Sequence, residues 1–349
     1  MVIHLARAFR QLDLPTDIVL GNAEGPLLEE LPSGVQIVDL HARRISRAIV
    51  PFASYLRKQQ PAGIVSLLTH VNLAAIAARS LARTPSRLCA CECGVLSAAT
   101  RQGGHFASPF FPILARLLYP FADARVAVSN ATADDMARSY GFPRGKIHVI
   151  VAPVDVEWIR SLATAAVDHP WFRDPSIPII LGVGRMAREK DFPTLVQAFA
   201  RLRAKRPLHL VLIGDGDQRP ILEQEVASLG LSADVWMPGF DPNPFRFMSR
   251  SAVTVAPSKW EAGAYSLLES MALGIPVVGT RCPGGVADFL GNGQLGPLAI
   301  PGNAESLANC IEEALSAPIS PRILQAHAET FSPVAIARRF LELTAPQYL

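Results

Sequence analysis

The chain has 349 residues, of which half are hydrophobic and 18% are charged. This composition excludes a disordered chain, and the length is sufficient for two α/β domains that each have a hydrophobic core. The sequence has no run of 18 apolar residues, no pattern of a secretory signal and only five cysteines, so we expect a cytosolic, reduced location.

The net charge of +3 is unevenly distributed along the chain. Residues 1–160 carry 17 Lys/Arg and 12 Asp/Glu, and the remaining residues carry 16 and 18. A mildly basic first half favours contact with an anionic inner-membrane surface or with an acceptor phosphate. Ordinary scatter of surface arginines explains the difference equally well. We expect no nucleic-acid partner.

Strands alternate with helices throughout the first half of the chain. This alternation predicts parallel βαβ units. The predicted helices are residues 2–9, 45–57, 71–82, 110–118 and 131–140, and the predicted strands are 17–21, 35–40, 63–68, 88–92, 125–128 and 147–151.

Residues 163–178 have no periodicity, and we interpret this stretch, which holds Trp171, Asp174, Pro175 and Pro178, as the linker between two domains. After them the alternation resumes. The predicted strands are 179–184, 208–213, 234–237, 252–256 and 275–278. The predicted helices are 192–202, 218–229, one that starts near 265 and ends before Gly274, 304–315 and 333–343. We therefore predict one domain over 1–165, a second domain over 166–332 and a C-terminal helix over 333–349.

Residues 258–279 form the most informative stretch, which predicts a loop, a helix, a tight turn and a buried strand. Gly274 is the expected end of the helix, and Pro276 cannot continue it. Glu261 lies before the helix and Glu269 lies about one turn inside it. At ~1.5 Å per helical residue plus an extended loop, the two carboxylates lie on the order of 10–15 Å apart.

The start of this helix predicts an anion site. The backbone N–H groups near Tyr265, Ser266 and Leu267 should lack intrahelical partners there. An acceptor, a phosphate cradle and a second acceptor in a row suit a long ligand with hydroxyls at both ends and phosphates in the middle. A nucleotide sugar has this form.

This stretch resembles the Glu-x7-Glu signature of the retaining glycosyltransferases of family 4, which have the GT-B fold. The flanking Ser258-Lys-Trp and Ala272-Leu-Gly-Ile-Pro-Val-Val also match. The resemblance implies two Rossmann-like, doubly wound parallel-sheet domains facing a cleft. The domain over 1–165 would then lie on the acceptor side, the domain over 166–332 would bind the nucleotide sugar, and the C-terminal helix would cross back to the first domain. It also implies that Glu261 approaches the donor sugar and that Glu269 holds the ribose hydroxyls. Without the flanking residues, a solvated loop Glu and a surface helix Glu would be the better interpretation.

A second motif, Gly184-Arg-Met-Ala-Arg-Glu-Lys-Asp191, lies where a predicted strand meets a helix. Catalysis of leaving-group departure needs positive charge aimed at the diphosphate, and Arg185 and Lys190 can supply it. The family has an Arg and a Lys at this spacing that bind the donor diphosphate in place of a metal. A solvated basic turn is the alternative. We include Gly184 among the donor contacts.

Two further loops of the second half contain residue types that bind metals or nucleotide bases. Gly214-Asp-Gly-Asp217 contains an Asp-x-Asp pair, but a structural turn with Asp217 as a helix N-cap is favoured over a metal site. We therefore expect no metal and no cofactor besides the donor. Phe240 resembles the family residue beside the nucleotide base, and a buried loop aromatic is an equal alternative.

Arg87-Leu-Cys-Ala-Cys-Glu-Cys-Gly94 places three thiols at alternate strand positions. Small buried strand residues are favoured over a metal site, because tetrahedral sites draw ligands from separated segments. Relatives carry a His just after this strand near the donor sugar, and Cys93 takes that position here. His70 and His105 are other candidates for the cleft.

The sequence departs from the family pattern at several points. Ala262-Gly-Ala264 replaces a Gly-aromatic-Gly, so that Ala264 crowds the sugar or needs another backbone angle, and Ala152 replaces an Asn. The chain also opens on a helix that family members precede with a strand and a Gly-Gly loop. We expect either a true start about 15–25 residues upstream of Met1 or a natural truncation, and an inactive or poorly soluble chain as it stands.

Together with the family resemblance, these features predict a retaining, metal-independent glycosyltransferase. It would transfer a sugar from a nucleotide diphosphate to a glycan or a lipid-linked sugar. One alternative is a degenerate nucleotide-sugar-binding protein without turnover. Another is a GT-B-fold epimerase or phosphorylase.

Overall fold

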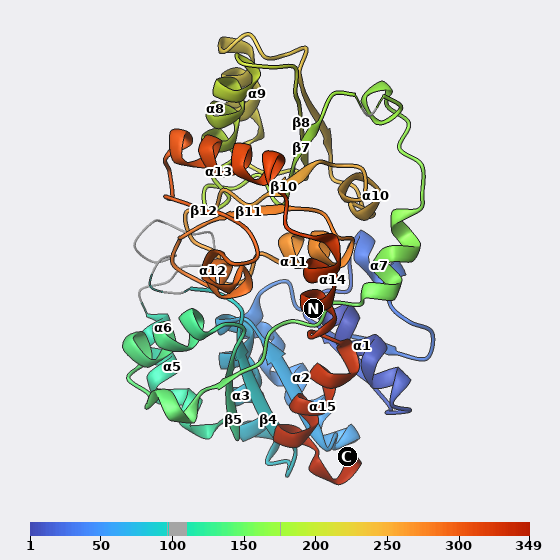
Figure 1. Cartoon of the computed structure of the whole chain (residues 1–349). Coiled ribbons are helices and arrows are strands. Elements are labelled where there is room, and N and C mark those ends of the chain that lie inside the picture. The colour runs from blue at the N-terminus through green and yellow to red at the C-terminus, as the bar shows by residue number, and fades with distance from the viewer. Residues whose placement is uncertain (96, 98–109, 175) are drawn as a thin grey trace. The chain divides into compact units, whose positions relative to one another are not determined.

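The structure is a computed structural model that describes residues 1–95, 97, 110–174 and 176–349. His105 lies outside the described residues. The chain divides into two compact units: unit 1 is Met1–Pro153 with Phe331–Leu349, and unit 2 is Val154–Thr330. Both units alternate helices and parallel strands (Figure 1).

Unit 1 contains two separate parallel sheets. One has four strands in the order β3-β4-β5-β6, and the other is the pair β1-β2. The strands are β1 (Asp17–Leu20), β2 (Gln36–Asp39), β3 (Gly63–Leu67), β4 (Arg87–Glu92), β5 (Ala124–Ala127) and β6 (His148–Val149). The predicted upstream strand stays a prediction.

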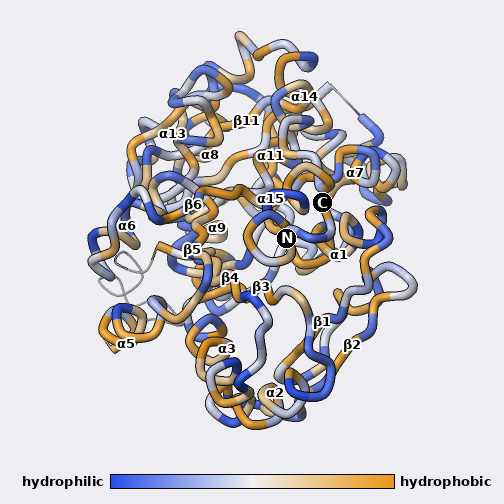
Figure 2. Tube along the Cα trace, turned by 90° about the horizontal axis from the view of Figure 1, so that it is seen from below, coloured by the Kyte–Doolittle hydropathy of each residue, from blue (hydrophilic) through white to orange (hydrophobic). Residues whose placement is uncertain are grey.

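The helices of unit 1 are α1 (Val2–Gln11), α2 (Ile45–Gln59), α3 (Thr69–Ala82), α5 (Phe111–Leu118), α6 (Asn130–Tyr140) and α15 (Pro333–Thr344). Helix α15 packs on α1, β3 and β4, although it comes from the other end of the chain. Gly63 allows this approach, because a Cβ there would lie 2.7 Å from Cβ of Thr344. Figure 2 shows the hydropathy along this trace.

The core of unit 1 lies between its sheet and its helices. Leu56 of α2, Ile76 of α3 and Leu88 of β4 are among its fully buried members. Tyr119, directly after α5, is also fully buried in it. The β4 strand is buried over five of its six residues, as expected for a parallel strand covered on both faces.

Unit 2 is built on one continuous six-stranded parallel sheet in the order β12-β11-β10-β7-β8-β9. The strands are β7 (Ile179–Val183), β8 (His209–Ile213), β9 (Val235–Gly239), β10 (Val253–Val255), β11 (Val277–Thr280) and β12 (Leu298–Ala299). The helices are α7 (Val156–Ala163), α8 (Phe192–Arg203), α9 (Arg219–Ser228), α10 (Phe245–Met248), α11 (Tyr265–Ala272), α12 (Val286–Phe289), α13 (Ala304–Ser316) and α14 (Pro321–Glu329).

The segment interpreted as a linker is held on unit 2 by aromatic rings. The His169 ring stacks on Trp236 with 4.0 Å between centroids, and the Trp171 ring stacks on His209 at 3.9 Å. Such contacts join residues far apart in the sequence, so local periodicity does not reveal them. Among the described residues, no helix has both the length and the hydropathy needed to cross a bilayer.

Candidate active site

The strand order in the sheet of unit 2 reverses between β7 and β10. Strands β8 and β9 follow β7 on one side, whereas β11 and β12 follow β10 on the other. In open parallel sheets, ligands bind in the crevice that such a switch point opens beyond the carboxyl ends of the strands. The loops after β7 and β10 contain the two motifs that the sequence analysis selected.

The structure brings Lys190 and Glu261 together across this switch point. The Lys190 ammonium lies 2.5 Å from Oε2 of Glu261, and the Ser258 hydroxyl donates to the same oxygen at 2.8 Å. Both charged side chains are largely buried. Arg185 pairs with Glu189 instead, and its guanidinium is half exposed.

A second ion pair links the same two loops, and the sequence analysis missed it. Lys259 Nζ lies 2.8 Å from Oδ1 of Asp191, and Oδ2 of Asp191 accepts from the Thr194 hydroxyl at 2.7 Å. The Lys259 N–H also donates to the Glu189 carbonyl at 2.8 Å. The signal in the sequence was that Lys190-Asp191 in one loop and Lys259-Trp-Glu261 in the other carry complementary charges. Which of these side chains form pairs depends on β7 lying beside β10, and local sequence does not show this.

The backbone of Glu261 is fixed from its other side. Its N–H donates to the Pro283 carbonyl at 3.0 Å, and its carbonyl accepts from Gly285 at 2.9 Å. A Cβ on Gly284 would lie 1.7 Å from the Glu261 carbonyl oxygen, so only glycine fits this approach. The position of Glu261 is therefore set by three loops.

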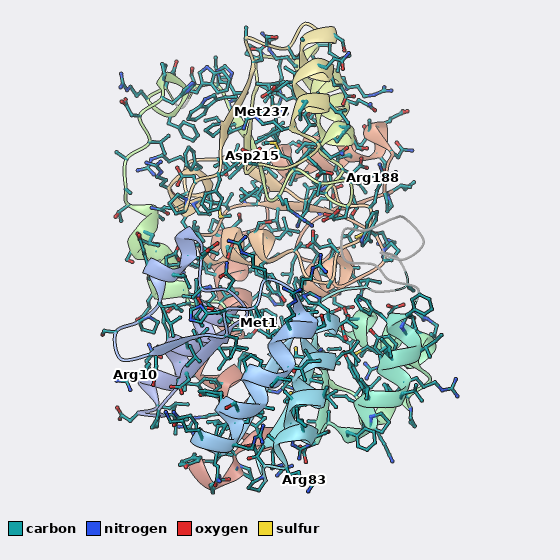
Figure 3. All side chains as sticks on the ribbon, turned by 180° about the vertical axis from the view of Figure 1, so that it is seen from behind. Met1, Arg10, Arg83, Arg188, Asp215 and Met237 are labelled. Carbon is teal, nitrogen blue, oxygen red and sulfur yellow. The ribbon has the colours of Figure 1, made fainter. Side chains whose placement is uncertain are left out.

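The loop after β8 closes against the loop after β7. A Cβ on Gly214 would lie 2.0 Å from the Gly184 carbonyl, and the Met186 N–H donates to the Asp215 carbonyl at 2.8 Å (Figure 3 labels Asp215). The predicted N-cap role of Asp217 is wrong, because Gln218 is the N-cap of α9 and makes no side-chain cap bond. The turn forms through backbone bonds instead.

Metal ligands are not gathered here. Over 1–95, 97, 110–174 and 176–349, no three or more His, Cys, Asp or Glu side chains are arranged to hold a metal ion.

The start of α11 differs in part from the prediction. The N–H groups of Tyr265 and Leu267 were expected to lack partners, but they donate to the carbonyls of Gly263 and Ala264, both at 3.0 Å. A tight turn at the helix start provides these acceptors. Ala264 itself has φ −80° and ψ 75°, so it needs no unusual backbone angle. Ser266, in the first turn, is partly exposed.

Glu269 lies in the middle of α11 and is half-buried. Burial raises the pKa of its carboxyl to about 7. The helix is anchored to the sheet one residue later, where the Ser270 hydroxyl donates to Thr254 of β10 at 2.8 Å. Phe240, directly after β9, is 56% exposed, so the alternative of a buried loop aromatic is wrong.

Unit 1 has a polar cluster at the carboxyl end of its own β4. Glu92 is fully buried, and its carboxylate accepts from the hydroxyls of Thr69 at 2.8 Å, of Tyr140 at 3.3 Å and of Tyr119. Burial raises the pKa of Glu92. Asn72 extends the network by donating to the Tyr119 hydroxyl at 3.0 Å.

The three thiols of the β4 region are all free. Cys89 and Cys91 are fully buried, as predicted for small strand residues, and Cys93 is partly exposed just past the strand. Burial raises the pKa of the Cys89 thiol to about 12, so it is inert at neutral pH. His70, next to Thr69 at the start of α3, is half-buried, and burial lowers the pKa of its imidazole.

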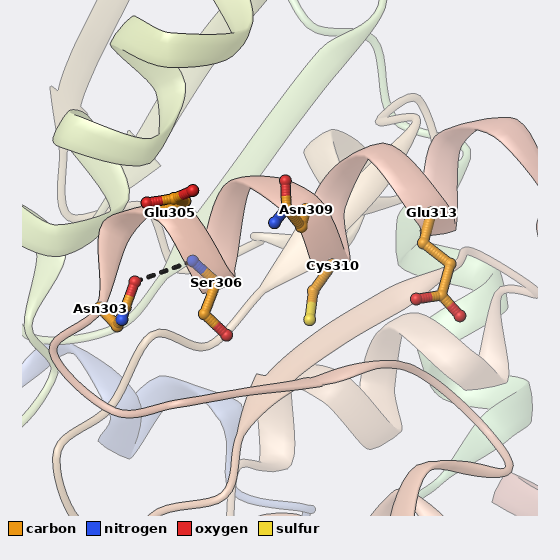
Figure 4. A pocket seen from close by; sticks show the side chains of 6 residues that line it. All are labelled: Asn303, Glu305, Ser306, Asn309, Cys310 and Glu313. Carbon is orange, nitrogen blue, oxygen red and sulfur yellow. Dashed lines mark hydrogen bonds between the residues drawn. The ribbon is translucent and has the colours of Figure 1, made fainter.

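A cavity of about 330 Å³ lies along α13 in unit 2. Its walls come from the face of that single helix (Figure 4). The lining residues are Asn303, Glu305, Ser306, Asn309, Cys310 and Glu313. None of them belongs to the loops at the switch point, so this cavity is separate from the candidate site.

Two family models match the two halves of the chain. "Glycosyl transferases group 1" matches residues 169–331, and "Glycosyltransferase Family 4" matches residues 1–158. The chain belongs to glycosyltransferase family 4. Family 4 enzymes are retaining, metal-independent glycosyltransferases that use nucleotide-sugar donors, so the predicted family and reaction class are confirmed.

Curated relatives of this family-4 chain include enzymes of glycan assembly. It is 28% identical over 279 residues to the Campylobacter jejuni N-acetylgalactosamine-N,N'-diacetylbacillosaminyl-diphospho-undecaprenol 4-alpha-N-acetylgalactosaminyltransferase, covering 79% of this chain and 74% of that protein. It is 33% identical over 186 residues to the Rhizobium meliloti lipopolysaccharide core biosynthesis glycosyltransferase LpsE. That second match covers 52% of this chain and only 54% of LpsE.

Solved structures of the same fold cover nearly the whole family-4 chain. Sucrose-phosphate synthase from Thermosynechococcus elongatus matches with a TM-score of 0.81 and 20% identity, over 98% of this chain and 91% of that one. Anabaena HepE in complex with UDP-glucose matches with a TM-score of 0.80 and 20% identity, over 98% and 93%. The predicted fold class, two parallel-sheet Rossmann-like domains of GT-B type, is confirmed.

Proposed function

We propose that unit 2 binds a nucleotide diphosphate sugar at the switch point between β7 and β10, and that the chain transfers the sugar to a glycan or lipid-linked acceptor with retention. One observation carries this proposal: Lys190 and Glu261, selected from separate motifs, lie 2.5 Å apart beyond the carboxyl ends of adjacent strands. An ordinary solvated basic turn would not bury this pair.

Lys190 and Arg185 supply the positive charge for the diphosphate leaving group. An ammonium has three donors, so Lys190 can hold Glu261 and a phosphate oxygen at the same time. The half-exposed Arg185 can add its planar fork to a second phosphate oxygen. Charge fixed before the reaction stabilises the departing diphosphate without reorganisation.

The other predicted contacts are spaced along the donor, from its sugar to its base. Glu261 accepts from sugar hydroxyls, Gly184 lets the backbone approach the diphosphate, and Phe240 offers its exposed ring to the base. Glu269 accepts from the ribose. Tyr265, Ser266 and Leu267 line the helix start, where the Ser266 N–H is the best remaining donor, because its two neighbours already have acceptors.

Two relatives support the proposed acceptor. The Campylobacter relative is named for a diphospho-undecaprenol substrate, and the Rhizobium relative is named for lipopolysaccharide core biosynthesis. A lipid-linked acceptor requires access to a membrane surface, which we place on the basic unit 1. A UDP-sugar is the first donor to test, because the HepE structure of the same fold contains UDP-glucose.

A screen of nucleoside diphosphates and nucleotide sugars by thermal shift tests donor binding. A ligand at 100 times its dissociation constant adds roughly 2.7 kcal/mol to the free energy of unfolding. Release of free sugar or transfer to an acceptor extract then separates an enzyme from a binder without turnover. Activity should persist in EDTA; loss that magnesium or manganese restores would assign Asp215 and Asp217 as ligands.

A further inference from the structure

Leu68 joins β3 to α3 with a backbone conformation that leucine rarely adopts. Its φ of 79° and ψ of 141° fall outside the regions open to residues with a Cβ, and glycine tolerates such a conformation best. Within the described ranges, seven non-glycine residues have a positive φ, and Leu68 is the one among them with an apolar side chain. Asp and Asn compensate for a positive φ with local hydrogen bonds, whereas a leucine side chain offers none.

Burial of the side chain does not account for the leucine at this position. Leu68 is 44% exposed, whereas Leu56 and Leu88 in the core of unit 1 are fully buried. A glycine at position 68 would allow the same backbone with less strain, and the core would lose only a half-exposed side chain. The strained position therefore carries a leucine side chain that the fold itself uses only in part.

A buried hydrogen-bond network holds the Leu68 backbone in place. The Leu68 N–H donates to the Cys91 carbonyl of β4 at 3.1 Å, and the Leu68 carbonyl accepts from the Asn72 N–H at 2.8 Å. The fully buried Asn72 side chain donates to the same Cys91 carbonyl at 2.9 Å. The next residue is fixed as well, because the Thr69 hydroxyl donates to the Glu92 carboxylate at 2.8 Å. Strained residues persist where their surroundings over-determine them, and such residues cluster at functional sites.

Leu68 lies at the edge of unit 1 where a ligand is expected. It directly follows β3, and the partly exposed Cys93 comes just after the neighbouring strand β4. In open parallel sheets, ligands bind beyond the carboxyl ends of the strands. Under the proposed function the donor is held by unit 2, so the substrate that remains for this edge of unit 1 is the acceptor.

We propose that the Leu68 side chain binds the acceptor by packing against the C–H face of the sugar ring that receives the transferred sugar. A branched alkyl group removes water from such a face without competing for the ring hydroxyls. The inference rests on the proposed function, because it names a contact for the second substrate of that reaction. Its evidence comes from unit 1 alone. Leu68 is thus a substrate-binding residue, and the network of Asn72 and Glu92 positions it.

Urea denaturation of the full chain tests whether position 68 is strained. The variants Leu68→Gly and Leu68→Ala both lose the leucine side chain, but only glycine also relieves the positive φ. The denaturation midpoint of Leu68→Gly should therefore lie above that of Leu68→Ala, the reverse of the order at an unstrained position. A lower midpoint for Leu68→Gly would overturn the proposal, because the leucine would then not be present at the expense of strain.

Transfer kinetics test the contact with the acceptor. The assay uses a nucleotide sugar selected by thermal shift, with octyl glucoside, octyl galactoside and octyl N-acetylglucosaminide as acceptor probes. Leu68→Ala and Leu68→Gly should both raise the acceptor KM about tenfold and leave the donor KM unchanged, because an apolar contact is lost from one substrate only. Leu68→Met keeps an apolar side chain of similar volume and should stay within about threefold of wild type.

The matched control is Arg83→Gly at the other end of α3. Arg83 is exposed and also has a positive φ, of 55°, so this variant relieves the same kind of strain outside the proposed contact. Its acceptor KM should equal that of wild type. A rise as large as that of Leu68→Gly would attribute the effect to the backbone of unit 1 and not to the leucine side chain.

Further outcomes would also overturn the proposal. Wild-type protein that binds a nucleotide sugar but transfers to none of the three octyl glycosides would do so, as would an acceptor KM of Leu68→Ala equal to that of wild type. A rise in the donor KM instead would assign Leu68 to the donor. Thermal shift with UDP on the same samples keeps the two proposals apart, because donor binding by unit 2 should be unchanged in every variant. Wild-type protein that binds no nucleoside diphosphate would remove the proposed function, and this inference with it.

Discussion

Glu92 in unit 1 and Glu261 in unit 2 both lie beyond the carboxyl end of a sheet strand, and the two carboxylates differ in their partners. Glu92 in unit 1 is fully buried and accepts from three hydroxyls. Glu261 in unit 2 is partly accessible and pairs with the Lys190 ammonium. A carboxylate surrounded by neutral donors fastens helices together, whereas one that holds a cation beside a switch point can orient charge toward a ligand. We therefore propose a structural role for Glu92 and a binding role for Glu261.

The largest expected effect comes from breaking the charged pair of unit 2. We expect Lys190→Ala to lower kcat/KM by about 10²–10³-fold, because the developing charge on the diphosphate loses a fixed donor. Steady-state kinetics with the donor identified by thermal shift measures this loss. Lys205→Ala is the control, since Lys205 is exposed at the end of α8. Equal activity of the two variants would remove Lys190 from the site.

The corresponding change in unit 1 should affect stability and leave donor binding intact. We expect Glu92→Ala to lower the free energy of unfolding by about 2–4 kcal/mol, because three buried hydroxyls lose their acceptor and a cavity remains. Glu92→Gln keeps an acceptor and should cost less. Chemical denaturation measures the change. Loss of UDP binding by folded Glu92→Ala protein would contradict the division of roles.

Glu92 also predicts a pH dependence of stability in unit 1. Burial raises its pKa above the ordinary value of 4.5 in the folded state. Between 4.5 and the raised pKa the native state binds more protons than the unfolded state, so the free energy of unfolding falls as pH rises through this window. Denaturation curves of wild type and Glu92→Gln should diverge there. Parallel curves would show that Glu92 does not titrate in this way.

The sequence predicted the site loops better than the contacts between them. The residues after β7 and β10 were selected from strand-to-helix spacing and charge type, which are local properties, together with the resemblance of the flanking residues to the family. The Lys259–Asp191 pair was missed because it depends on β10 lying beside β7, which no local pattern encodes. Similarly, the helix at 110–118 was predicted from periodicity, but not which of its apolar side chains would be exposed. Periodicity identifies apolar faces without saying which one the core covers.

The two sheets illustrate the same limit. Strand positions were predicted in both units, but not that six strands would join in unit 2 while unit 1 would form a pair and a set of four. Strand order depends on long-range pairing. The residues missed in unit 2, such as the stacked Trp171 and His209, also act across the sequence.

A smaller effect is expected at the second ion pair of unit 2. Asp191 is buried and Lys259 is half exposed, so we expect a coupling energy of only about 1 kcal/mol in a double-mutant cycle of Lys259→Met and Asp191→Asn. If the pair positions Lys190, the coupling should appear in kcat/KM as well as in stability. Lys259→Arg should restore part of it. Additive losses in kcat/KM would limit the pair to a structural role.

The smallest expected effect concerns Glu269, where binding and stability should respond to pH in opposite directions. Burial raises its pKa to about 7. A carboxylate accepts from ribose hydroxyls better when ionised, so affinity for a nucleotide sugar should rise about three- to tenfold between about pH 6 and 8. A nucleotide sugar is the suitable probe, because its diphosphate has no terminal proton to lose in this range.

The raised pKa of Glu269 also affects stability. The folded state binds more protons than the unfolded state between pH 4.5 and about 7, so the free energy of unfolding falls as pH rises through this range. Glu269→Gln should abolish both trends, and isothermal titration with parallel denaturation curves measures them. An affinity that rises equally in wild type and Glu269→Gln would place the titrating group elsewhere.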